Sequence, residues 1–347
     1  MPYGTVNADL MTTSDGISSS GLYGFKNRLI NSAMVIDQRN AGALINPMAD
    51  ATYYLDRWRA SATQTSKLSI GQNAGSVTPP AGFTNYMGFT SLSAYSITSG
   101  DIFGIAQNIE GFNVADLGWG TANAQAVTLS FWVRSSLTGT FGGSFRNSAS
   151  SRSYPISYTI SSANTWEQKS ITVAGDTSGT WLTTNGIGIL LFLSLGSGST
   201  YSGTAGSWSG SVYTSATGAT SVVGTNGATF YITGVQLEKG STATSFDYRP
   251  FGTELSLCQR YYQLAGMGLT YYNATGSQQG RFSGTPCVTP RTSPTFTLVS
   301  SNVVGNVSSA TPSSYNSGAT IHLQVVSSAG SGSYTDANYT YSLSAEL

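Results

Sequence analysis

Charged side chains are scarce in this sequence. They make up 9% of the 347 residues, with 15 basic and 15 acidic residues and a formal net charge of zero, whereas soluble proteins carry roughly 25%. A nucleic acid or an anionic membrane surface needs a basic patch to neutralise its phosphates, and the sequence has no run of like charge. The longest apolar run, residues 187–195, is too short to cross a bilayer. We therefore expect no nucleic-acid partner and no membrane insertion.

Cysteine and histidine are almost absent. Cys258 and Cys287 are too few for a disulfide framework and lack zinc-ligand spacing, so we expect two reduced, buried thiols in a protein that folds in a cytoplasm. The single histidine, His322, lies in a predicted strand, where a structural role is expected. These absences exclude metal sites built on histidine and cysteine, and the sequence predicts no metal and no cofactor.

Carboxylates suited to catalysis are also few. Glycoside hydrolysis, the most serious enzymatic alternative, needs two carboxylates that flank the scissile bond. The best acidic group consists of Asp101, Glu110 and Asp116, followed by Trp119 as a candidate stacking ring. In a strand-rich fold such carboxylates commonly cap turns or pair with arginine. The sequence therefore favours a protein that is not an enzyme and keeps a capsule depolymerase as the less favoured alternative.

Glycine, hydroxyl residues and aromatic residues take the place of charge. The chain has 41 glycines and 12% aromatic residues, which is too much apolar ring area for a disordered chain. Residues 126–134 alternate apolar and polar side chains, and residues 186–195 are typical of a strand buried on both faces. Short strands between turn signals, with no convincing helical period before Pro250, predict an all-β fold, a jelly-roll β-sandwich.

Two further stretches are predicted strands of the same sandwich. Residues 229–239 carry apolar side chains on one face, and Gly234 breaks their alternation as a β-bulge would. Residues 26–42 alternate through Leu29 and Met34 and predict the first strand.

Length and composition divide the chain into three segments. Residues 1–25 form a polar arm with no secretory-signal pattern. Its isolated apolar residues suit docking on other proteins, which we expect, and a disordered leader is the alternative. Residues 26–250 form the jelly roll, and residues 251–347 form a smaller C-terminal β domain that begins with a helical turn or two in residues 254–264. Because a neutral, hydroxyl-rich surface is poorly protected against association, a homo-oligomer is expected.

A long stretch of small residues carries the candidate binding residues. Residues 196–227 are almost entirely glycine, serine, threonine and alanine, yet they retain Tyr201, Trp208 and Tyr213. The apolar face of a sugar packs on an aromatic ring while its hydroxyls meet polar side chains. Together with Trp119, these three aromatics are the candidate glycan-binding residues. The same features suit a subunit interface, and the sequence leaves both interpretations open.

Six segments form an ordered set of motifs: residues 27–42, 54–58, 129–135, 232–238, 246–250 and 254–262. In this order they resemble a family of tailed-bacteriophage virion proteins, which includes tail-fibre, receptor-binding and structural proteins. The resemblance implies a homotrimer of the virion, assembled in the host bacterial cytoplasm. It also implies attachment to other virion proteins through residues 1–25 and contact with host surface polysaccharide at the other end.

The jelly-roll region has a second resemblance. The strand at residues 130–133, Trp166 and the closing strand at residues 230–237 are similar to those of carbohydrate-binding modules. Many such modules carry an aspartate pair where this chain has Thr233 and Gly234, and this departure argues against a calcium ion carried there. The two resemblances predict a tail fibre or receptor-binding protein that adheres to host glycans. A capsid-attached head fibre or decoration protein is the alternative.

Overall fold

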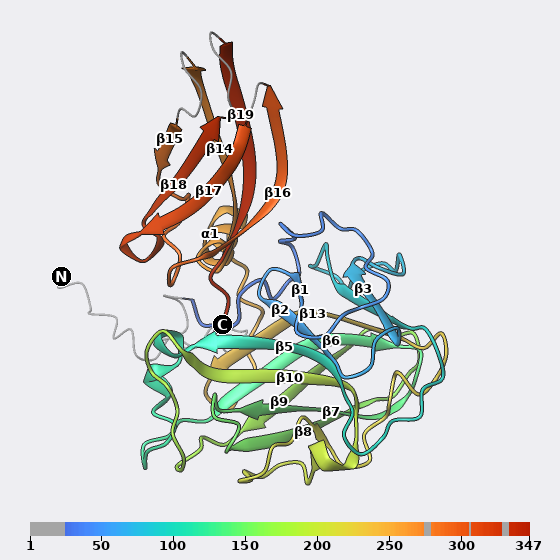
Figure 1. Cartoon of the computed structure of the whole chain (residues 1–347). Helices are drawn as coiled ribbons and strands as arrows, with labels where there is room; N and C mark the ends of the chain where they lie inside the picture. The colour runs from blue at the N-terminus through green and yellow to red at the C-terminus, as the bar shows by residue number, and fades with distance from the viewer. Residues whose placement is uncertain (1–24, 274–278, 305–306, 328–332) are drawn as a thin grey trace, which may run out of the picture. The chain divides into compact units, whose positions relative to one another are not determined.

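The computed structural model describes residues 25–273, 279–304, 307–327 and 333–347 (Figure 1). Apart from Phe25, the predicted attachment arm, residues 1–25, lies outside these ranges. The chain divides into two compact units, of which the first ends at Arg249 and the second begins at Pro250. No helix in the described ranges is long and apolar enough to cross a membrane.

The first unit is a sandwich of two antiparallel sheets. The six-stranded sheet has the order β1-β2-β5-β10-β7-β8 and consists of Tyr53–Leu55, Trp58–Ala62, Ile102–Glu110, Ile187–Ser197, Gly139–Arg146 and Ser153–Ile160. The five-stranded sheet has the order β3-β4-β13-β6-β9 and consists of Leu68–Gln72, Met87–Ser91, Thr229–Lys239, Val127–Ser135 and Glu167–Val173. Strands far apart in the sequence are neighbours in both sheets (Figure 1). This arrangement confirms the predicted all-β jelly-roll β-sandwich.

Alternation along the strands builds the core between the two sheets. Every second residue of β6 is fully buried in it: Val127, Leu129, Phe131 and Val133. In β10, Leu191 and Leu193 belong to the same core, whereas Phe192 between them is 1% exposed on the opposite face. β10 is therefore buried on both faces, as its sequence predicts.

Gly234 forms the predicted bulge in β13. The register between β13 and β6 shifts between Thr233 and Gln236, and Gly234 has a φ of 60°. A Cβ atom at this position would lie 2.5 Å from the ring of Phe83. Both the backbone conformation and the close approach of Phe83 therefore require glycine.

Residues 26–42 do not form the predicted strand. Asn31 and Met34 have φ values of 55° and 59°, which lie in the left-handed region and interrupt an extended chain. The Asn31 side chain fixes this turn, because its Nδ2 donates to the carbonyl oxygen of Ile36 (2.8 Å) and its Oδ1 accepts from the Ile36 N–H (2.9 Å). The apolar residues that suggested a strand are buried by a folded turn.

Two of the motif segments join the points where the chain enters and leaves the first unit. The N–H of Asn27 donates to Asp247 Oδ2 (3.1 Å), and the Arg249 guanidinium donates to the carbonyl oxygen of Leu29 (3.0 Å). The Asn27 Oδ1 also accepts from the N–H of Leu237 in β13 (3.0 Å). These contacts give the polar residues of the motifs a structural role.

The second unit is a smaller β structure that follows the helix α1 (Phe251–Gln259). One three-stranded sheet has the order β14-β19-β16 and consists of Tyr262–Asn273, Ser333–Ser344 and Thr295–Val304. The other has the order β15-β18-β17 and consists of Gln279–Gly284, Thr320–Ser327 and Val307–Tyr315. Residues of both sheets share one core, including Met267, Leu323 and Leu343.

The rare cysteines and histidine all lie in the second unit. Cys258 is buried in α1, but Cys287 is exposed, so the expectation of two buried thiols is wrong for Cys287. Cys287 lies in the connection between β15 and β16, outside the core. His322 Nδ1 lies 3.1 Å from Ser283 Oγ, and its ring is 4.7 Å from that of Tyr315. These are contacts with neighbouring strands, as expected of a structural histidine.

Candidate functional site

The predicted loop aromatics lie in a single connection of the first unit. They are Tyr201, Trp208 and Tyr213, and each is partly exposed. The connection, residues 199–216, leads away from β10, and we name it the aromatic loop. Its two ends are held together because β11 (Ser202–Gly203) pairs in parallel with β12 (Ser215–Ala216).

The middle of the aromatic loop is fixed to the edge strand β8. The N–H of Gly206 donates to the carbonyl oxygen of Pro155 (3.0 Å). Ser209 and Ser153 exchange backbone hydrogen bonds of 2.8 and 3.0 Å. The loop therefore covers part of a sheet edge that would otherwise expose unpaired backbone groups, and it holds its aromatic residues in defined positions.

Trp208 packs into a cluster of four aromatic rings, which we name the tryptophan cluster. Its ring centroid lies 5.3 Å from Trp119, 5.4 Å from Trp181 and 5.1 Å from Tyr154. All three pairs have the edge-to-face geometry that the ring quadrupoles favour.

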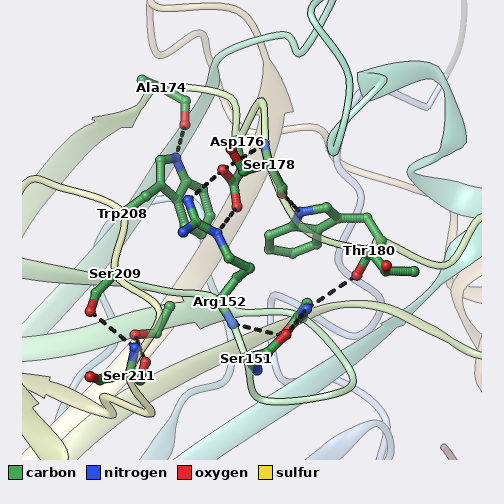
Figure 2. A network of polar contacts seen from close by, with 12 residues as sticks. Ser151, Arg152, Ala174, Asp176, Ser178, Thr180, Trp208, Ser209 and Ser211 are labelled. Carbon is green, nitrogen blue, oxygen red and sulfur yellow. Dashed lines mark hydrogen bonds and ion pairs between the residues drawn. The ribbon is translucent and has the colours of Figure 1, made fainter.

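The N–H groups of the tryptophan cluster all have acceptors. Trp208 Nε1 donates to the carbonyl oxygen of Ala174 (2.8 Å), as Figure 2 shows. The other two indoles donate to carbonyl oxygens of Gln125 and Ser178: Trp119 Nε1 at 2.8 Å and Trp181 Nε1 at 3.1 Å. The three indole N–H groups of the cluster are therefore all satisfied, as in a structural core.

The ion pair beside Trp208 is bidentate. Arg152 Nε and Nη2 donate to the two carboxylate oxygens of Asp176, both at 2.7 Å (Figure 2). These hydrogen bonds raise the pKa of the Arg152 guanidinium. The same guanidinium lies 5.9 Å from the centre of the Trp208 ring. Arg152 stands directly before β8, so the ion pair holds its guanidinium in place against Trp208.

The structure corrects the expectation for Trp119. This residue is only 6% exposed, and its ring is enclosed by Trp181 at 4.7 Å and by Trp208. A ring without a free face cannot stack on a sugar, so Trp119 supports the cluster from within. The structure brings it together with Trp208, which stays partly exposed.

A second group of side chains lies on the outer face of the six-stranded sheet, turned away from the main core. Arg59 of β2 and Arg146 of β7 reach this face because the residues beside them in each strand, including Trp58 and Phe145, belong to the core. The strand pairing places Arg59 in one row across the sheet with two other residues. They are Phe192 of β10 and Ser144 of β7. We name these four outer residues, together with Tyr201, the arginine face.

The arginine face has polar atoms that lack partners. Arg146 lies 5.9 Å from the centre of the Phe192 ring, and its Nε is buried with no hydrogen-bond partner among the described residues. Ser144 Oγ is also buried with no hydrogen-bond partner among the described residues. Burial lowers the pKa of Arg146 to about 10, and the charge of Arg59 acts in the same direction, while Tyr201 opposes it. The guanidinium therefore stays charged at neutral pH.

The three candidate catalytic carboxylates have different surroundings. Asp101 is buried and accepts hydrogen bonds from Thr98, Thr63 and Tyr95. Although burial by itself raises its pKa, these bonds outweigh that effect and hold the pKa at about 2.

The other two carboxylates differ in exposure. Glu110, at the end of β5, is buried. Asp116 is exposed and pairs with Arg28 at 2.9 Å and with Lys239 at 3.5 Å. Asp101 and Asp116 therefore have the capping and pairing roles that the sequence favours.

The described part of the surface includes two open hollows away from these groups. One, of about 380 Å³, is lined by Gln168, Lys169, Ser170, Ala243, Thr244 and Ser245. The other, of about 520 Å³, belongs to the second unit and is lined by Gly266, Met267, Gly268, Ser300, Ser301, Asn302, Asn338, Tyr339 and Thr340. Neither contains a predicted binding residue. Among the described residues, no group of three histidine, cysteine, aspartate or glutamate side chains could hold a metal ion.

Several residues of these groups were not selected from the sequence. Trp181 could have been suspected from its position in a glycine-rich turn region, as the other loop aromatics were. Arg59 and Arg146 each stand next to apolar residues in strands, and that alternation predicts an outward side chain. The sequence carries no signal that the strands of the two arginines belong to the same sheet.

No known protein family and no curated protein matches this sequence. Among solved structures, the chain is similar to the enzymatically active domain of tailspike protein 4 of bacteriophage CBA120, with 13% identity and a TM-score of 0.31. The match covers 53% of this chain and 19% of that chain, so this chain spans about a fifth of its length.

Two carbohydrate-binding modules are similar to a comparable degree. TmCBM61, solved with β-1,4-galactotriose, has 10% identity and a TM-score of 0.30 over 62% of this chain and 99% of that chain. The family 11 module of Clostridium thermocellum, solved with a β-1,3-1,4-mixed-linked tetrasaccharide, has 11% identity and a TM-score of 0.29 over 58% of this chain and 98% of that chain. Similarities this weak say nothing about what this chain binds.

Proposed function

We propose that this protein is a non-enzymatic, glycan-binding structural protein of a bacteriophage particle. In this proposal it adheres to host surface polysaccharide through the aromatic loop and the arginine face, as a tail fibre or receptor-binding protein does. The place in the particle rests on the resemblance of the motif segments. Glycan binding rests on the geometry of the first unit.

The observation that carries glycan binding is the anchoring of the aromatic loop. Its three aromatic residues are partly exposed, and its other residues are mostly small and carry hydroxyl groups. Sugars need this combination, because they present apolar C–H faces together with hydroxyls. Since β8, β11 and β12 already fix the loop, binding does not have to order it first, which favours affinity.

The non-enzymatic part of the proposal rests on how the acidic residues are used. Asp101 holds a turn, Asp116 pairs with two cations, and Glu110 is buried. A glycosidase needs two carboxylates on either side of one bond, about 5–10 Å apart. These roles favour a binding protein over a depolymerase.

A glycan array probed with the full-length protein tests the binding function. We expect specific binding, and a loss of about two- to twelvefold in Tyr201→Ala, since an aromatic contact contributes about 0.5–1.5 kcal/mol. Tyr315→Ala is the matched control, because Tyr315 is a 59% exposed tyrosine of the second unit. Absence of binding to any glycan, or an equal loss in both variants, would refute this site.

Two further measurements test the assembly. Size-exclusion light scattering should give three times the chain mass of 36.2 kDa if the protein is a homotrimer. Co-sedimentation with purified phage tails and capsids, with and without residues 1–24, tests the arm. Attachment to capsids without any glycan binding would favour the head-fibre or decoration alternative.

A further inference from the structure

The two arginines of the arginine face lack acidic partners. Within the described ranges, no carboxylate lies within ion-pair distance of Arg59 or Arg146, whereas Arg28 and Arg152 each pair with an aspartate. Both side chains project from the same face of the six-stranded sheet, and the charge of Arg59 lowers the pKa of Arg146. Two neighbouring positive charges without a counter-charge repel each other, so this arrangement disfavours the unliganded state.

Hydrogen bonding at the same place is also incomplete. The buried Arg146 Nε and Ser144 Oγ have no partner in the described part of the chain. A guanidinium has only donors, so Arg146 needs an acceptor. Water could accept these hydrogen bonds, but it could not neutralise the two charges. An anionic acceptor satisfies both requirements.

The surroundings narrow the kind of anion. The aromatic loop, which carries the partly exposed ring of Tyr201, is fixed along β8, and β8 is the neighbour of β7, the strand of Arg146. An acidic sugar residue uses both features, because it has a C–H face for the ring and an anionic group for the guanidinium. Nucleic acid fits poorly, because it requires an extended basic surface and this chain has zero net charge.

We propose that the arginine face binds the anionic group of an acidic polysaccharide, with Arg146 as the main contact and Arg59 as the second cation. This inference rests on the proposed glycan-binding function and narrows its ligand to charged glycans. Ser144 and Phe192 are 0% and 1% exposed, so they support the two arginines from within the fold and do not touch the sugar. Tyr201 packs against the same sugar residue.

The test is a glycan array that contains neutral glycans and glycans with uronate, sialate, sulfate or phosphate groups, probed with the full-length protein. We expect binding to acidic glycans only, and weaker binding as the salt concentration rises from 50 to 500 mM. In Arg146→Leu the binding should fall by tenfold or more, because a charge-assisted hydrogen bond is removed. Arg59→Leu should reduce it less, and it serves as the second variant if Arg146→Leu does not fold.

Arg134→Leu is the matched control. Arg134 of β6 also has a buried Nε without a partner among the described residues, and it lies 5.9 Å from the Tyr231 ring. It belongs to the five-stranded sheet, away from the arginine face. Both substitutions remove one positive charge, so a non-specific effect of net charge would appear in both. We expect unchanged binding in Arg134→Leu.

The outcomes separate this inference from the function on which it rests. Binding to neutral glycans only would overturn the acidic ligand and leave glycan binding in place. Acidic binding that Arg146→Leu and Arg59→Leu leave unchanged, or that Arg134→Leu weakens equally, would overturn the site. Absence of binding to any glycan would overturn both proposals. Which acidic group binds best distinguishes carboxylate, sulfate and phosphate as the source of the anion.

Discussion

The tryptophan cluster and the arginine face both include a residue of the aromatic loop, but they use their polar atoms differently. In the cluster each indole N–H has an acceptor, and the adjacent Arg152 has a bidentate carboxylate partner. On the arginine face a buried guanidinium nitrogen and a buried hydroxyl lack partners within the described residues. The comparison teaches that aromatic content alone does not identify a binding surface. We therefore base the proposed site on the two arginines without acidic partners.

The largest effect on stability is expected for the Arg152–Asp176 ion pair beside the tryptophan cluster. Arg152→Leu leaves the Asp176 carboxylate, which is 1% exposed, buried without its partner. We expect the free energy of unfolding to fall by about 3–5 kcal/mol, as when one member of a buried ion pair is removed. Urea unfolding followed by tryptophan fluorescence measures it. A loss below about 1 kcal/mol would show that the pair does not stabilise the cluster.

The pH dependence of the free energy of unfolding tests a second group with satisfied hydrogen bonds, the turn that Asp101 holds. Because its folded-state pKa is about 2 against an ordinary value of 3.8, Asp101 stabilises the fold above its unfolded-state pKa. That contribution is lost as the pH falls from about 4 to 2. The difference in the free energy of unfolding between wild type and Asp101→Asn should therefore shrink over this window. A difference that stays constant from pH 7 to pH 2 would contradict the assignment.

The smallest effect is expected for an exposed ion pair. Lys239 and Asp116 are 3.5 Å apart, and their side chains are 42% and 47% exposed. Lys239→Ala should change the free energy of unfolding by less than about 1 kcal/mol, because water screens the charges. The same urea experiment measures it and sharpens the contrast with Arg152. A loss as large as that of Arg152→Leu would mean that exposure does not separate the two pairs.

The parts of the fold that depend on local patterns could be predicted from the sequence. The period of two identified β6, a continuous apolar run identified β10, and the broken alternation at Gly234 identified the bulge, because these patterns follow directly from strand geometry. The turn at Asn31 could not be predicted in this way. Its left-handed backbone is stabilised by its own side chain, and the apolar residues around it still alternate.

The candidate site depended on contacts between distant residues. Composition identified Tyr201 and Trp208, but it did not show that Trp119 is enclosed by other tryptophans. The strand order β2-β5-β10-β7 places Arg59 and Arg146 in one sheet. Strand order is a non-local property that a single sequence does not display. For the same reason the unmatched atoms became visible only in the folded chain.

The most direct test of the account measures stability and glycan binding on the same sample of Arg146→Leu. Because this substitution removes a charge that has no partner in the described chain, we expect the free energy of unfolding to stay within about 1 kcal/mol of wild type. Binding to acidic glycans should fall by at least tenfold. A variant that unfolds as easily as Arg152→Leu but still binds acidic glycans would contradict the account.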